Sequence, residues 1–232
     1  MMEKTKHFFD RHKYTVGVFL LLSAASLICI SLVVARVGYS NTTRYVGLIW
    51  NLFLAWIPFV LAYLAYALSW RRKLVYFIIP IFAILWLIFF PNAPYILTDF
   101  QHLSNLATDV PVWFDVIMLI WFAWTGFLLG VISLYLMQNI IRREFGRAIG
   151  WLFVAVVSML SGGGIYIGRF VRWNSWDVLS NPFGIASELL NQAMDPSLRS
   201  IGFISLYALF FLFVYVTLYA FGHLLQEQSE QV

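Results

Sequence analysis

Residues that could carry out acid–base chemistry gather in one stretch of the chain. Asp99 and His102 stand three residues apart, and Asp115 follows shortly afterwards. Residues at this spacing share one face of a helix, where a carboxylate and an imidazole can orient each other as acid and base. Asp99, His102 and Asp115 are therefore the candidate catalytic residues. A structural alternative stays open, in which Asp99 caps its own helix and His102 lies at a membrane surface.

The same stretch does not favour a transition-metal site. Cys29 is the only cysteine, and His102 is the only histidine in the connections between apolar runs. Zinc sites are built mainly from several Cys and His ligands, so any metal here would have to be a hard, oxygen-preferring ion. We predict no metal and no cofactor.

A second group of residues is suited to an anion. Arg169 and Arg172 are also three residues apart, and guanidinium groups match the geometry of phosphate. This pattern favours an anionic lipid headgroup or a polyprenyl phosphate as ligand. Alternatively, these arginines pair with Asp99, Asp115 or Asp177 and lock two loops together. The candidate ligand-binding residues are Arg169, Arg172, Asn92, Asn51, Asn174 and Asp177.

The composition places these residues in a membrane protein. Hydrophobic residues make up 62% of the chain and charged residues 11%, against roughly 45–50% and about 25% in soluble domains. A spanning helix needs about 20 mostly apolar residues. Six such runs lie at about 15–35, 46–69, 74–90, 113–138, 148–168 and 200–222. We predict an all-α, polytopic helix bundle with six spans, forming a single integral membrane domain over residues 1–232.

The distribution of Lys and Arg predicts the orientation. Ten of them lie in the tail before residue 15 and in the turns 70–73 and 142–147, against five on the opposite side. Positive residues concentrate in cytoplasmic loops, so both termini are expected in the cytoplasm. Because these basic residues lie in short turns between spans, they do not favour a nucleic-acid partner.

The two long outer connections, 91–112 and 169–199, are expected to carry short helices. The prolines of Pro91-Asn92-Ala93-Pro94 disfavour helix, so the third span should end there. Thr98 and Gln101 then match a capping box that opens a helix at Thr98. Helical spacing at about 183–194 predicts a second one. Both helices are expected to lie along the membrane surface.

Polar residues within the spans concentrate in their outer halves. Asn51, Ser158 and Ser161 are examples, and polar groups inside a bilayer require partners. This clustering predicts an outward-facing polar pocket between spans two to five, closed by the outer loops. The inner half is expected to be more apolar. The glycine pairs Gly126/Gly130 and Gly164/Gly168 favour close helix packing.

Three segments carry a family resemblance. They read NLFLAWIP at 51–58, FPNAPYILTD at 90–99 with HL at 102–103, and GRFVRWNSWD at 168–177 with NP at 181–182. The chain resembles the bacterial membrane-protein family catalogued as domain of unknown function 1361. The resemblance implies a multi-pass protein of a bacterial plasma membrane, and it implies no activity.

Three classes of function fit these observations. The first is a binding or accessory protein whose outer pocket holds an anionic lipid or lipid-linked intermediate, with membrane lipids as partners. The second is a membrane-embedded enzyme that acts on such a substrate through Asp99, His102 and Asp115. The third is a small-solute transporter, which would need a polar path through the inner half. The arginine pair and the surface helices favour the first class.

Overall fold

The computed structural model describes residues 2–70, 72–105, 110–173, 176–195 and 197–230. Every regular element within these residues is a helix. The six long helices are α1 (Met2–Ser40), α2 (Gly47–Leu68), α3 (Arg72–Phe89), α5 (Val112–Phe145), α6 (Arg147–Tyr166) and α9 (Leu198–Glu230). The shorter elements are α4 (Asn92–Tyr95), the 3₁₀ helix η1 (Ile96–Asn105), the π-helical turn η2 (Ile167–Val171), α7 (Asp177–Ser180) and α8 (Pro182–Met194).

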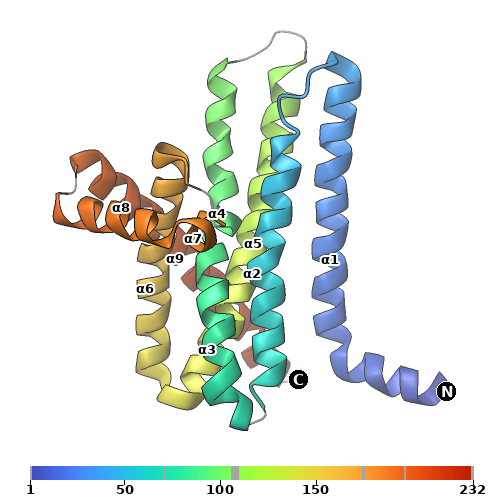
Figure 1. Cartoon of the computed structure of the whole chain (residues 1–232). Coiled ribbons are helices and arrows are strands. Elements are labelled where there is room, and N and C mark those ends of the chain that lie inside the picture. The colour runs from blue at the N-terminus through green and yellow to red at the C-terminus, as the bar shows by residue number, and fades with distance from the viewer. Residues whose placement is uncertain (1, 71, 106–109, 174–175, 196, 231–232) are drawn as a thin grey trace.

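Six helical segments are long and apolar enough to cross a membrane, as the composition predicts. They cover Thr15–Ser40, Gly47–Leu68, Tyr76–Leu103, Val112–Phe145, Arg147–Val171 and Leu198–Leu225. The long helices run side by side, with α1 beginning and α9 finishing at the same end of the bundle (Figure 1). We call this end the termini end and the opposite one the loop end.

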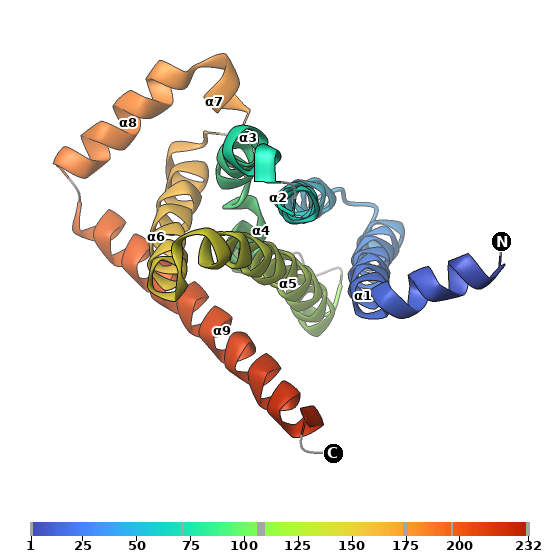
Figure 2. The same cartoon turned by 90° about the horizontal axis from the view of Figure 1, so that it is seen from below.

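Helix α5 is the centre of the bundle. It contacts α1, α2, α4, η1 and α6. In an apolar 18-residue stretch of α5, 61% of the residues are buried, against 17% in the corresponding stretch of α9. Seen along the bundle, α1 and α9 lie at the periphery on different sides of α5 (Figure 2). The apolar outer faces of α1 and α9 are therefore available to lipid.

The third crossing is interrupted halfway. Helix α3 ends at Phe89, as the two prolines predict, and Asn92 Nδ2 donates to the Phe89 carbonyl at 2.8 Å. The chain then resumes as α4 and η1 and continues beside the first half of α5 toward the loop end (Figure 1). The expected capping box is wrong: Thr98 lies inside η1, and its Oγ1 donates to the Tyr95 carbonyl at 2.7 Å. The short helix predicted here to lie along the membrane surface instead runs beside α5, as part of the third crossing.

Glycines hold the interrupted segment in place. A Cβ on Gly126 would lie 2.6 Å from the Ala93 carbonyl oxygen, and one on Gly164 would lie 2.6 Å from Pro91 Cγ. A Cβ on Gly130 would meet that of Ala93 at 3.2 Å. These glycines of α5 and α6 therefore let α4 approach both helices closely, which agrees with the packing role predicted for them.

The connection between α6 and α9 carries α7 and α8. Helix α8 matches the helix predicted at 183–194 and runs across the long helices at one side of the bundle (Figure 1). Its start follows the usual rules: Asn181 Oδ1 accepts from the Gly184 amide at 3.0 Å, and Pro182 occupies the first turn.

Candidate functional site

Asp99 is the centre of a buried polar cluster that joins α2, η1 and η2. Its side chain is 2% exposed. Asn51 Nδ2 donates to Oδ2 at 2.8 Å, Arg169 Nη1 lies 3.2 Å from Oδ1, and His102 Nε2 lies 3.7 Å from Oδ1. The structure thus brings Asp99 and His102 together, as their spacing predicts. The imidazole is 39% exposed.

Arg169 is held by the interrupted crossing. Besides Asp99, it donates to the Tyr95 hydroxyl at 3.1 Å and to the Thr98 carbonyl at 2.9 Å, and its guanidinium lies 5.5 Å from the centre of the Tyr95 ring. Both terminal nitrogens are therefore engaged. For Arg169, this geometry matches the alternative in which the arginine forms an ion pair and joins the two outer segments, η1 and η2.

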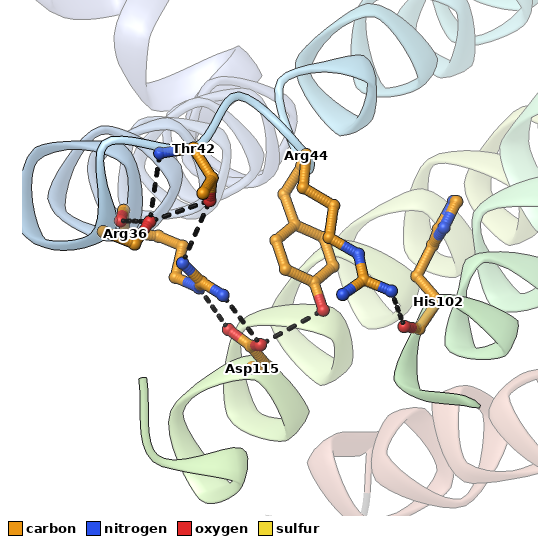
Figure 3. Close-up of polar contacts among 7 residues, drawn as sticks. Arg36, Thr42, Arg44, His102 and Asp115 are labelled. Atoms are coloured by element: carbon orange, nitrogen blue, oxygen red, sulfur yellow. Dashed lines mark hydrogen bonds and ion pairs between the residues drawn. The ribbon is translucent and has the colours of Figure 1, made fainter. Parts of the chain in front are cut away.

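Asp115 belongs to a separate cluster at the loop end (Figure 3). Arg36 Nε lies 2.8 Å from Oδ1 and Nη2 lies 3.4 Å from Oδ2, and the Tyr45 hydroxyl donates to Oδ2 at 3.1 Å. The side chains of Arg36 and Asp115 are 1% and 2% exposed. The partner of Asp115 is thus Arg36, and neither Arg169 nor Arg172.

Tyr45 separates the two carboxylate clusters. Its ring packs edge-to-face on that of His102, with centroids 6.2 Å apart. Its neighbour Arg44 donates to the His102 carbonyl at 2.7 Å (Figure 3). Burial, and then the charge of Asp115, raise the pKa of the Tyr45 hydroxyl, which therefore stays a donor to alkaline pH. The three candidate catalytic residues are accordingly divided between two adjoining groups.

Sequence reasoning missed Arg36 and Tyr45 as site residues. One signal was available: Arg36 ends the first apolar run and Asp115 begins the fourth. Two opposite charges at the same depth of neighbouring spans are expected to pair, because an unpaired charge there is costly.

A pocket of about 370 Å³ lies between α2, the end of α3, α4, α6 and α8; we call it the α2–α6 pocket. Asn51, Asn92 and Tyr95 give it a polar side. The remaining lining residues are apolar, aromatic or small: Trp50, Leu54, Leu87, Ile88, Pro91, Leu160, Gly164, Ile167, Gly168, Trp173 and Ile185. The pocket therefore lies among spans two, three and five, and α5, the fourth span, supplies no lining residue.

The other predicted ligand-binding residues are placed as follows. Arg172 is exposed, follows η2 in a left-handed conformation with φ 66°, and precedes the pocket residue Trp173. No side-chain hydrogen bond or ion pair joins its guanidinium to another described residue. Asp177 begins α7 and is half-buried. Asn174 lies outside the described residues.

The described residues contain no group of three or more His, Cys, Asp or Glu side chains that could hold a metal ion. Asp99 and His102 form a pair only, and Asp115 is taken up by Arg36 and Tyr45. The chemistry available to these two clusters is therefore that of hydrogen bonds, ion pairs and one half-exposed imidazole.

Six membrane-length helices around a buried polar cluster define a multi-pass membrane protein. A family model described as "Protein of unknown function (DUF1361)" matches residues 50–217, and the chain belongs to this family. Neither the curated proteins nor the solved structures contain a match. The matched region includes Asp99, Arg169 and the whole α2–α6 pocket, whereas Arg36 and Tyr45 precede it.

Proposed function

We propose that the protein binds an anionic lipid or a lipid-linked intermediate in the α2–α6 pocket. The observation that carries the proposal is the lining: an apolar wall from α2, α3 and α6 meets a polar side formed by Asn51, Asn92 and Tyr95. This division suits a molecule with a hydrocarbon chain and a polar head. The volume of about 370 Å³ falls within the roughly 300–1,000 Å³ of small-molecule sites.

The charge for the headgroup comes from Arg172 in this proposal. Arg169 already neutralises Asp99 inside the protein, so its charge is not available to a ligand. Arg172 is exposed and adjoins the pocket residue Trp173. Indole rings concentrate at headgroup depth, and a guanidinium binds phosphate through paired hydrogen bonds.

Native mass spectrometry of the protein extracted gently from its own membrane tests this proposal. Ile88→Trp should fill the pocket and release the bound lipid, whereas Ile84→Trp is the matched control, because Ile84 lies one turn earlier on α3 and is 62% exposed. Arg172→Gln should selectively lose anionic species, and Arg147→Gln at the termini end should not. If Ile88→Trp retains the same lipids as Ile84→Trp, the pocket is not the binding site.

An enzyme acting on a lipid-linked substrate is the second candidate. It is supported by the buried Asp99 carboxylate behind a half-exposed His102 imidazole, 3.7 Å apart, which is an arrangement suited to general acid–base chemistry. His102→Gln should then change the mass of the lipid-linked species that co-purifies, because its conversion would stop. Unchanged masses would exclude a catalytic role for His102.

We also propose that both termini face the cytoplasm of a bacterial plasma membrane. The excess of Lys and Arg in the tail and turns of the termini end supports this orientation. Fusions after residue 230 test it: a fluorescent protein that matures in the cytoplasm should be active, and alkaline phosphatase should not. The opposite pattern would reverse the orientation.

A small-solute transporter is the third class, and it requires a polar route through both halves of the bundle. The buried polar groups that could line such a route lie outside the α2–α6 pocket, on or beside α9.

A further inference from the structure

Four buried polar atoms have no hydrogen-bond partner among the described residues. They are Arg169 Nε, Tyr207 Oη, Ser161 Oγ and Gln138 Nε2. Buried polar atoms are nearly always paired, and unpaired ones often mark a bound water or ligand. In this bundle they fall into two groups, at different heights along α9.

The first group, which we call the far group, lies beside the Asp99–Arg169 ion pair. The Tyr207 ring stacks on that of Phe203, with centroids 5.0 Å apart, and Phe203 packs edge-to-face at 5.2 Å on Phe170, the neighbour of Arg169 in η2. Ser161 precedes Gly162, whose Cβ would lie 2.7 Å from the Ile204 carbonyl, one turn before Tyr207. Ser161 itself is 2% exposed. The far group therefore presents three unpaired polar atoms next to the interrupted third crossing.

The second group, the near group, lies toward the termini end. Gln138 is 0% exposed, and its Oε1 accepts from the Tyr215 hydroxyl. With the amide flipped, Nε2 would donate to the Tyr215 hydroxyl and Oε1 would have no partner, so one polar atom of Gln138 is unpaired in either orientation. Arg142 Nη1 donates to the Tyr219 hydroxyl at 2.8 Å. A cleft of about 290 Å³ adjoins this group. Its walls are mainly apolar, from Leu128, Val131, Ile132, Leu218 and Gly222, with Tyr135, Tyr215, Tyr219 and His223 as its polar or aromatic lining residues.

Aromatic rings separate the two groups. Tyr207, Phe211, Tyr215 and Tyr219 follow one another at four-residue intervals on α9, so they form one ridge of that helix. Phe211 lies between the far and near groups and is 1% exposed. Its ring contacts those of Phe90 at 5.6 Å and Phe127 at 5.4 Å. Apolar constrictions of this kind can exclude water from a polar path.

We propose that the far and near groups are two hydrated chambers of one route through the bundle, closed in this structure by the aromatic layer of Phe90, Phe127 and Phe211. The far chamber is neutral overall, because Arg169 balances Asp99 and its other polar groups are hydroxyls, whereas the near chamber adds an amide and the cation Arg142. Such a lining suits water and small neutral polar solutes. The interruption of a crossing helix beside the far chamber is the kind of irregular backbone found where membrane helices line a cavity. This inference does not rest on lipid binding in the α2–α6 pocket.

Cysteine accessibility tests the two chambers. In a Cys29→Ser background, Ser161→Cys and Gln138→Cys are exposed to a small water-soluble methanethiosulfonate. Val157→Cys and Leu134→Cys are the matched controls, since each lies four residues earlier on the same helix and is 1% or 0% exposed. Because a thiol must ionise in water to react, the chamber positions should react at least about tenfold faster than their controls. Equal rates would overturn the proposal.

Osmotic swelling of proteoliposomes tests the closed route. Phe211→Ala should raise the permeability to water and glycerol, whereas Leu209→Ala, at a position 63% exposed on the same helix, should match wild type. Phe127→Ala is the second variant if Phe211→Ala does not fold. A folded variant of the aromatic layer with no more permeability than Leu209→Ala would refute the route.

Discussion

Breaking the buried ion pair between Arg36 and Asp115 should destabilise the protein strongly. The two side chains are 1% and 2% exposed, and Arg36 Nε lies 2.8 Å from Asp115 Oδ1. Removing one member leaves the other charged and buried, which costs about 3–5 kcal/mol in proteins. Arg36→Met and Asp115→Leu should each lower the free energy of unfolding by about that amount.

The double variant separates this mechanism from a simple loss of packing. With both charges gone, no uncompensated charge remains, so the double variant should be no less stable than either single variant. The coupling energy of the cycle should then be about as large as one single effect, on the order of 3 kcal/mol. Steric trapping in bicelles measures these free energies, with Arg147→Met at an exposed position as control. Additive effects, or single effects below about 1 kcal/mol as for surface pairs, would refute the reasoning.

Three further predictions concern neighbouring parts of the site. Gly126→Ala should lower the free energy of unfolding by about 1–3 kcal/mol, because its Cβ would lie 2.6 Å from a carbonyl of α4. The control Gly163→Ala, whose Cβ meets nothing within 4 Å, should leave that free energy unchanged. Unfolding measurements of both variants check this. Tyr45→Phe should cost about 1.5–3 kcal/mol by loss of a hydrogen bond to a carboxylate. The pKa of Tyr45 is raised above its ordinary value of 10.0, so this contribution should be complete below that pH and disappear as the pH rises through the raised pKa; a stability difference between wild type and Tyr45→Phe that does not shrink at alkaline pH would contradict it. Asp99→Asn leaves Arg169 buried without a counter-charge, so it should reduce the folded fraction on size-exclusion chromatography, and adding Arg169→Gln should restore it; a fully folded Asp99→Asn protein would argue against the structural role of this ion pair.

The sequence predicts the helices well because their signals are local. Apolar runs define the six crossings, and the prolines at 91 and 94 define the interruption of the third. The path of the chain after this interruption could not be predicted in the same way. Thr98 resembles a helix cap in isolation, but the chain has already resumed its helix at Asn92, because glycines of α5 and α6 accept α4 between them.

The partners within the site depend on packing between distant segments. The spacing of Asp99 and His102 predicts their proximity, and the ion pair of Arg169 with Asp99 was one of two alternatives. The choice between those alternatives is made by the position of η2 against Tyr95, which no local pattern encodes. Gln138 was missed because the inner half was predicted to be more apolar and a single amide in a long apolar run gives little signal.

The most direct test of the lipid-binding proposal is an electron cryo-microscopy map of the protein in nanodiscs formed with its native lipids. The proposal predicts an elongated density in the α2–α6 pocket, with a chain along Leu54 and Ile88 and a head beside Asn92 and Arg172. Lipid densities confined to the outer faces of α1 and α9, with the pocket closed by side chains, would contradict it.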